Sequence, residues 1–237
     1  MQLPIVLKQT PVWKNLPVQE QKAAWKAALD LVGSLQNLNE RGEQVVQAIV
    51  DGREFVEWEH YPDDDVRDNK NASQYFYHSH TGLQRPFVEH GHFHLFVHAE
   101  TLGFRKKDHR YEPAPAHLIA VSMNEIGMPT GFFTVNRWVT KGPWLNYKQC
   151  EEGLNHFHIS GKHGKKDINV FLHALVALYK DNILALIRQR DEIMSKLCDG
   201  RDRRTVFADE GIEVLGYTPI EIMEDIAALD EIFGEEE

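Results

Sequence analysis

The chain has little cysteine, no long apolar run and a deficit of basic residues, and each shortage excludes a class of protein. Cys150 and Cys198 are the only cysteines in 237 residues and form no CxxC pair, so we expect neither a disulfide framework nor a cysteine-based zinc site. No stretch approaches the roughly 18 apolar residues of a membrane span. The 26 Lys and Arg against 36 Asp and Glu give a net charge of −10, which disfavours nucleic acid as a partner. These absences predict a soluble, cytoplasmic protein that binds neither membrane nor nucleic acid.

The motifs of several large enzyme classes are missing as well. The sequence contains no GxSxG, Walker loop, GxGxxG or HExxH, so a serine hydrolase, a nucleotide-binding enzyme and a zincin all lack support. Apolar residues at 42% and charged residues at 26% are nevertheless ordinary for a globular protein. A chain of this length suits one large domain, and we predict a single domain over 1–237.

Hydrophobic periodicity predicts helices at both ends of the chain. Residues 18–51 are expected to be helical, as an amphipathic helix over 18–36 and a second one over 40–51 that Asn39 caps. Residues 167–233 are expected to be mainly helical again. This region should begin with a long helix from Asp167 to Leu197, bent near Asp181-Asn182, and end with a helix that starts at a Thr218-Pro219-Ile220-Glu221 capping box.

Between the helical regions, over 73–139, the period changes from 3.6 to 2. This change predicts an α+β fold with a central antiparallel sheet of about four strands, covered by the N- and C-terminal helices. The first two strands should form a β-hairpin around a loop with Gly82 and Pro86. The four predicted strands are 73–80, 89–98, 117–123 and 131–139.

Histidine is the unusual residue, with 13 in the chain. Residues two apart on a strand share a face, so His90, His92 and His94 should project together, as should His78 and His80. If the hairpin pairs 80 with 90, it also pairs 78 with 92, and the two rows meet with about 5 Å between Cβ atoms. A slip of one residue would separate them.

Neutral imidazole is the commonest metal ligand, and no cysteine or compact carboxylate cluster competes with these rows. Glu89 or Glu59 could add a carboxylate, which would give the mixed ligand set of non-haem iron sites. The candidate catalytic side chains are Glu89, Tyr77 and Arg137, and the planar guanidinium of Arg137, on the strand 131–139, could bind a substrate carboxylate or phosphate. The predicted cofactor is a transition metal, iron or zinc, with at least three ligands among His78, His80, His90, His92, His94 and His117.

Three resemblances bear on this cluster. His92-Phe93-His94 with a third histidine elsewhere resembles the ligand spacing of α-type carbonic anhydrases, and the HxH pairs resemble the first cupin motif, although the next glutamate after His80 is Glu89, too late for that motif. The string EHGHFHLF, with SQYFYHSH before it and FTVNRWVT after it, resembles an uncharacterised bacterial family. That resemblance covers the middle third to half of the chain and implies a real domain without implying an activity.

The sequence thus predicts a metal-dependent enzyme acting on a small molecule. Iron(II) with an open position would activate O₂, whereas zinc would support hydrolysis or hydration through a bound water. One alternative is a non-catalytic protein that binds a metal, haem or another ligand on the same face. Another is a metal-free interaction domain, whose imidazoles bond to each other, to Tyr75 and Tyr77, or to water.

The remaining histidines and the acidic run are predicted to be structural or solvated. His156 and His158 form another HxH pair in a segment that resembles a loop, and His163 there should be solvated. His173 lies in an apolar helical pattern and should be a core histidine. Asp63-Asp64-Asp65 with Asp68 should form a solvated turn, because the spacing of a calcium-binding loop is absent.

Overall fold

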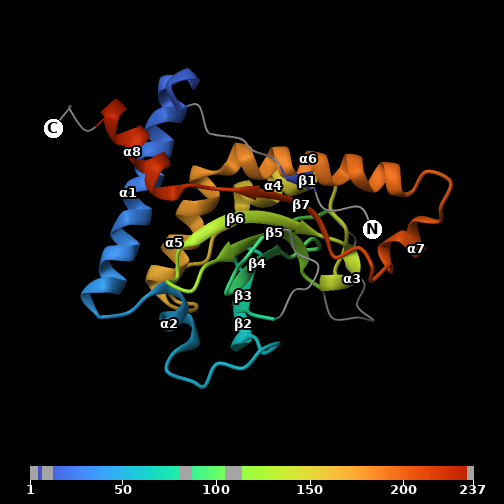
Figure 1. Ribbon diagram of the computed structural model, residues 1–237, viewed down its shortest axis with the longest axis horizontal. Coiled ribbons are helices and arrows are strands. Elements are labelled where there is room, and N and C mark those ends of the chain that lie inside the picture. Colours follow the sequence, from blue (N-terminus) through green and yellow to red (C-terminus); the bar gives the residue numbers. More distant parts are fainter. Residues whose placement is uncertain (1–4, 7–12, 81–86, 105–113, 234–237) are drawn as a thin grey trace.

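A computed structural model describes residues 5–6, 13–80, 87–104 and 114–233, and a twisted sheet lies at its centre (Figure 1). Within these residues the strand order is β1-β7-β6-β5-β4-β3-β2. The short β1 (Ile5–Val6) pairs with β7 in parallel, and the other six strands pair with one another in antiparallel fashion. The α+β fold and the antiparallel sheet are confirmed, with six such strands instead of about four. These are β2 (Tyr61–Asp68), β3 (Ser73–His78), β4 (Gly91–Val97), β5 (Ala116–Met123), β6 (Pro129–Val135) and β7 (Val214–Pro219).

The two antiparallel strands that periodicity missed, β2 and β7, lie outside the predicted sheet region. In β2, Asp63 and Asp64 are exposed on an edge strand, where a register shift between Tyr61 and Val66 interrupts the alternation. In β7, Thr218 pairs with Phe132 of β6. Thr218 is therefore a buried strand residue and not the predicted helix cap. Pairing with a neighbouring strand overrode the local capping signal.

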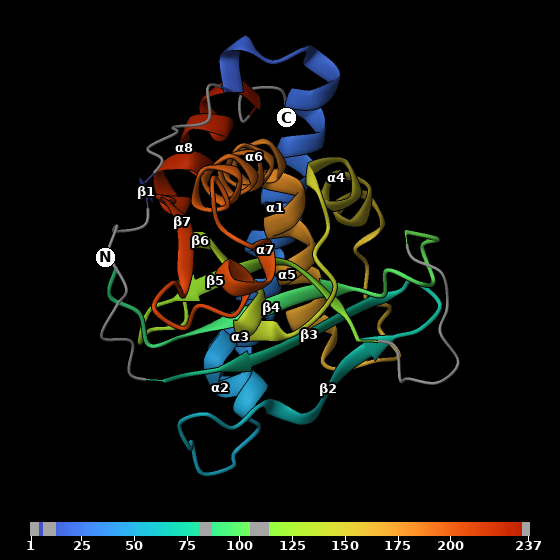
Figure 2. The same cartoon turned by 90° about the vertical axis from the view of Figure 1, so that its right-hand side faces the viewer.

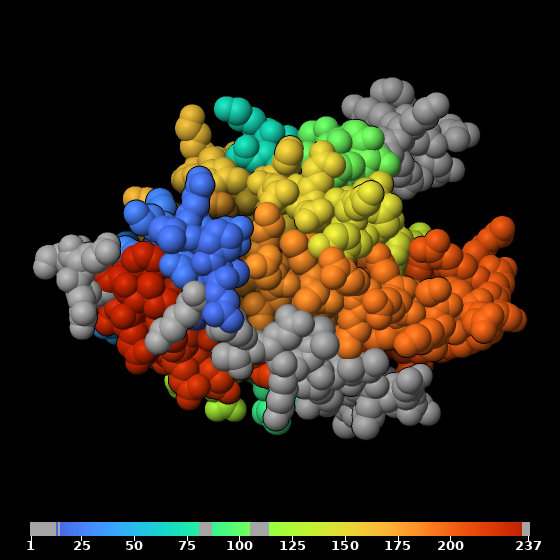
Figure 3. Space-filling view, turned by 90° about the horizontal axis from the view of Figure 1, so that it is seen from above, coloured from blue at the N-terminus to red at the C-terminus, as the bar shows by residue number. Residues whose placement is uncertain are grey.

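Helices cover one face of the sheet (Figure 2). Seen from above, α1 (blue), α8 (red), α6 (orange) and the yellow segment that includes α4 lie on that side of the molecule (Figure 3). The main core lies beneath them, where Tyr75, Tyr77, Phe93 and Leu95 meet helix residues such as Leu31. The helices are η1 (Trp13–Asn15), α1 (Val18–Glu40), α2 (Val45–Val50), α3 (Arg137–Thr140), α4 (Tyr147–His156), α5 (Lys166–Leu178), α6 (Lys180–Leu197), α7 (Arg203–Phe207) and α8 (Ile222–Phe233).

The helix boundaries correct several expectations. The long C-terminal helix is bent, as predicted, and α5 and α6 meet at 71° on either side of Tyr179. Asn39 lies inside α1, and Gln44 forms the capping box of α2 in its place. Asp167 lies in the first turn of α5, where it accepts a hydrogen bond from Arg41 Nη2 at 2.8 Å. Among the described residues, no single helix is long and apolar enough to cross a membrane, although the bent pair α5–α6 would be if taken together.

The opposite side of the sheet, here called the imidazole face, carries Phe76 and His78 of β3 and His92 and His94 of β4. A small apolar cluster adjoins them on β5, β6 and β7, where Ala120, Phe133, Val135, Val214 and Tyr217 pack together. Strand alternation therefore separates an apolar face under the helices from a face rich in imidazole.

Candidate metal centre

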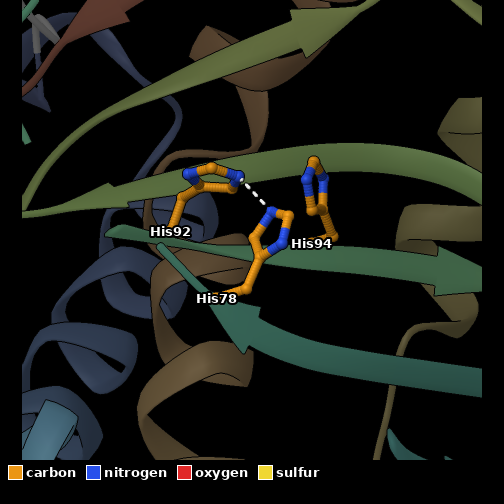
Figure 4. A group of neighbouring side chains, drawn as sticks. All are labelled: His78, His92 and His94. Carbon is orange, nitrogen blue, oxygen red and sulfur yellow. Dashed lines mark hydrogen bonds between the residues drawn. The ribbon is translucent and has the colours of Figure 1, made fainter. Parts of the chain in front are cut away.

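Three histidines converge on the imidazole face (Figure 4). The antiparallel register pairs His78 with His92 and Phe76 with His94, which confirms the predicted pairing of 78 with 92. The Nε2 atoms of His78 and His92 are 2.7 Å apart. One ligand atom from each of His78, His92 and His94 lies within 4.8 Å of the other two, so this triad could hold a metal ion.

The triad is enclosed by aromatic rings. His92 and His94 are each 1% exposed, whereas His78 is half-buried. The Phe133 ring lies edge-on to His92, with 5.1 Å between centroids, and Phe76 lies 5.2 Å from His94. Water reaches the buried pair poorly, so charges and dipoles there act through a lower dielectric than at the surface.

Glu89 contacts the triad from behind His92. Its Oε1 lies 2.9 Å from His92 Nδ1, and its side chain is 5% exposed. A carboxylate accepts from Nδ1–H, which leaves the Nε2 lone pair of His92 directed at His78. Metal-binding histidines usually donate their outer N–H to an acceptor, and a carboxylate is one of the common ones. Glu89 therefore stands as a partner of a ligand and does not join the triad itself.

His117 has the corresponding place behind His94. Its Nε2 is 2.9 Å from His94 Nδ1, after a register shift in β5 that sets His117 opposite Phe96. Burial, with a smaller contribution from the charge of Arg190, lowers the pKa of His117 to about 3. The ring is therefore neutral near pH 7, and no like charge faces His94 from this side.

The other two predicted ligands bracket the hairpin loop, whose Gly82 and Pro86 lie outside the described residues. The His80 ring stacks on Trp58 at 4.1 Å and lies 5.4 Å from His92, at the rim of the triad. His90 does not share the face of His92, because its Nδ1 lies 2.8 Å from Tyr77 Oη on the helix-covered side. A Cβ on Gly91 would lie 2.5 Å from that hydroxyl, so glycine is what allows this approach.

Tyr77 and Arg137 do not lie at the triad. Tyr77 belongs to the core under the helices, and burial raises the pKa of its hydroxyl above the usual range. Arg137 lies on α3 and not on a strand, because β6 ends at Val135 and the Asn136 side chain caps the short helix. Its Nε donates to Gly142 O at 3.1 Å. Glu59, the other carboxylate considered, is exposed.

Sequence reasoning missed a histidine–aspartate pair beside the triad. His60 stacks on Phe76 at 3.7 Å, and its Nδ1 lies 2.9 Å from Asp65 Oδ1. Asp65 has a φ of 52° within the irregular part of β2 and also accepts from Gln74 Nε2 at 2.6 Å. The segment before β2 carries no periodicity that would have predicted either contact.

Among the acidic run and the remaining histidines, Asp68 and His173 have other surroundings than predicted, whereas His163 is exposed as expected. Asp68 is buried in β2 and accepts hydrogen bonds from the amides of Lys70, Asn71 and Ser160. Burial raises the pKa of Asp68, but these hydrogen bonds outweigh it and hold the pKa below the usual range. His173 is exposed, 5.2 Å from His158, and is not a core residue. His156, at the end of α4, and His163 are also exposed.

Comparison with known proteins identifies a family without an assigned role. A family described as a domain of unknown function, DUF6969, matches residues 25–220. The chain belongs to this family, which confirms the expected resemblance to an uncharacterised one. No curated protein and no solved structure matches the chain.

Proposed function

We propose that this protein is a metal-dependent enzyme acting on a small molecule, with a first-row transition metal bound by His78, His92 and His94. The observation that supports the proposal most directly is the pair of Nε2 atoms 2.7 Å apart on His78 and His92, with Glu89 at the other nitrogen of His92. Two such nitrogens repel each other unless a proton or a cation lies between them. Coordination of both nitrogens to one cation removes that repulsion.

The spacing suits a metal after a small adjustment. Two imidazole nitrogens bound at about 2.0–2.1 Å to one tetrahedral ion lie roughly 3.3 Å apart. The His78–His92 distance is 2.7 Å, so a modest ring rotation opens it to that value. Glu89 and His117 contact Nδ1 of His92 and His94, respectively. We therefore assign Nε2 of both residues as the ligand atoms.

Three ligands and an aromatic wall suit catalysis better than storage, because catalytic zinc sites keep one coordination position open. An all-imidazole set also favours zinc, with hydrolysis or hydration, over the mixed His/carboxylate set of non-haem iron, since the three possible ligands that converge are imidazoles and Glu89 lies at Nδ1 of His92. When bound, zinc would supply a water of lowered pKa. Glu89 would hold the proton of His92 on Nδ1, so that Nε2 of His92 stays free to bind the metal. Phe133 would exclude bulk water.

The alternative is a non-catalytic metal-binding protein, and His80 is the feature that favours it. Its ring lies 5.1 Å from that of His78 and 5.4 Å from that of His92, between centroids. A rotation of this rim residue would supply a fourth imidazole and close the coordination sphere. Structural zinc sites are closed in this way.

Titration of the metal-free protein with Co²⁺ separates these outcomes. The enzyme proposal predicts one Co²⁺ per chain and visible bands that shift when azide is added, because azide enters an open position. Bands that azide leaves unchanged would indicate a closed site and support the non-catalytic alternative. Absence of Co²⁺ binding would contradict both. His163→Ala is the matched control, since His163 is an exposed histidine outside the site.

A further inference from the structure

A small cavity lies where β5 begins and β6 ends, and two arginines line it. Its volume is about 10 Å³, and Arg137 of α3, Arg190 of α6, His117, Gly142 and Trp144 are among its walls. None of the described residues that line it is acidic. The cavity thus gathers positive charge at the end of the sheet, where residues from both of its faces meet.

Arg190 is held in a fixed orientation. It is 3% exposed, and its Nη2 donates to Leu145 O and to Asp191 Oδ1, each at 2.7 Å. Its guanidinium lies over the Trp144 ring at 4.3 Å. Asp191 balances the charge of this buried group, and the hydrogen bonds and the stacking fix the plane of the guanidinium.

The charge of Arg137 is not balanced in the same way. Its Nε donates to Gly142 O, and its guanidinium lies 5.9 Å from the Phe207 ring. Among the residues that the structure describes, no carboxylate forms an ion pair with Arg137. Asp191 offsets the charge of Arg190, whereas no carboxylate of the described residues offsets the charge of Arg137. The cavity therefore carries one net positive charge.

We propose that this cavity binds a carboxylate group of the substrate, which makes the substrate of the proposed enzyme a small carboxylic acid. The cavity is small, which favours a planar carboxylate over the bulkier tetrahedral phosphate. Planar guanidinium groups match carboxylate geometry, and charge-assisted hydrogen bonds are the strong ones. His117 lines the cavity and contacts His94, so the site adjoins the triad. The identification as substrate rests on the proposed function, but the anion site does not.

The test uses metal-free, ¹⁵N-labelled protein and NMR of the arginine Nε–Hε groups. Formate and acetate should shift the Arg137 and Arg190 signals saturably, and neutral acetamide should not. Arg137→Gln should weaken formate binding about tenfold or more, as expected for loss of one charged hydrogen-bond donor. Arg188→Gln is the matched control, because Arg188 is exposed on α6, the helix of Arg190, and lies over Tyr147, which does not line the cavity. It should bind formate as the parent does.

Other outcomes would overturn the proposal. Formate binding that Arg137→Gln leaves unchanged, or saturable shifts with chloride alone, would mean that the cavity is not a carboxylate site. Equal binding of phosphate and formate would contradict the size argument. Intact formate binding in a protein that fails to bind Co²⁺ would refute the proposed function and leave the anion site standing. Co²⁺ binding without any formate response would refute the anion site and leave the proposed metal centre standing.

Discussion

The two faces of the central sheet are almost equally buried on β4 but differently filled. On β4, Phe93 and Leu95 point toward the helices and are 0% exposed, while His92 and His94 point away from them and are each 1% exposed. Removing an apolar side chain from water stabilises the fold by about 1.5–3 kcal/mol. Burying imidazole gives no such gain unless its nitrogens find partners. The helix-covered face therefore explains why the protein folds, and the imidazole face needs a different explanation.

The hydrogen-bond partners of the buried polar groups explain why the imidazole face is buried. Asp68, at the far end of the β2–β3 hairpin, accepts from the backbone amides of Lys70, Asn71 and Ser160. Those contacts suffice to explain its burial. His92 instead meets a second imidazole nitrogen at 2.7 Å on its Nε2 side, with a carboxylate behind its Nδ1. This comparison separates structural burial of polar groups from burial that prepares a binding site.

Removing ligands from the imidazole face should have the largest effect. Replacing His92 and His94 together with alanine should lower metal affinity by about 10⁴-fold, because each lost ligand should cost at least the roughly 100-fold of a lost ligand partner. The free energy of unfolding should change little, since the helix-covered face stays intact. Co²⁺ titration and urea unfolding measure the two quantities. Full metal binding by the double variant would mean that the site is elsewhere, and His156→Ala, at an exposed histidine, is the control.

The same strand should respond in the opposite way when its other face is changed. Phe93→Ala should lower the free energy of unfolding by about 3–5 kcal/mol, through lost transfer energy and the cavity left behind. Folded molecules should still bind the metal, because Phe93 does not touch the triad. Urea unfolding gives the loss in stability. Phe207→Ala is the matched control, because Phe207 is only partly buried on α7; an equal loss there would mean that the effect at Phe93 does not come from its complete burial in the core.

Local pattern predicted the part of the fold that strand alternation governs. The starts of β3, β4 and β5 fall within two residues of their predicted positions, because apolar or aromatic side chains alternate there. β2 escaped prediction because its exposed aspartates and its register shift hide the alternation. β7 escaped because Thr218-Pro219 is also a helix-start signal, and only pairing with β6 decides between the two structures.

The contacts of the candidate site also fall into those that strand alternation predicted and those that it did not. Alternation and hairpin pairing were enough to predict that His78 meets His92. They failed for His90, which contacts Tyr77 before the regular strand begins at Gly91. They also failed for Arg137, because Asn136 ends the strand by capping α3. The contact of His117 with His94 follows a shift of register within β5. Such irregularities depend on the tertiary neighbours and leave no periodic signal in the sequence.

Asp68→Asn tests the structural half of the comparison. An amide cannot accept all the hydrogen bonds that this carboxylate accepts, so we expect a loss of about 2–3 kcal/mol at pH 7. Because the folded pKa of Asp68 lies below the usual value of about 3.9, its contribution is fully present above pH 4 and is lost as the pH falls further. The difference between parent and variant should therefore shrink in acid. Urea unfolding from pH 7 to pH 3 measures it, and Asp64→Asn, at an exposed position of β2, should show neither effect.

Glu89→Gln tests the functional half and should have the smallest effect. The substitution preserves size and a hydrogen-bond acceptor for His92 Nδ1, but it removes the negative charge that makes His92 Nε2 a better donor to a cation. Loss of such a partner costs about 10–100-fold in metal affinity, and we expect the lower end, near tenfold, because the acceptor remains. Co²⁺ titration should show this with unchanged stoichiometry, and Glu59→Gln, at an exposed glutamate nearby, should bind as the parent does. If Glu89→Gln also binds Co²⁺ as the parent does, the carboxylate behind His92 is a structural partner like those of Asp68, and the distinction between the two kinds of polar burial fails at this residue.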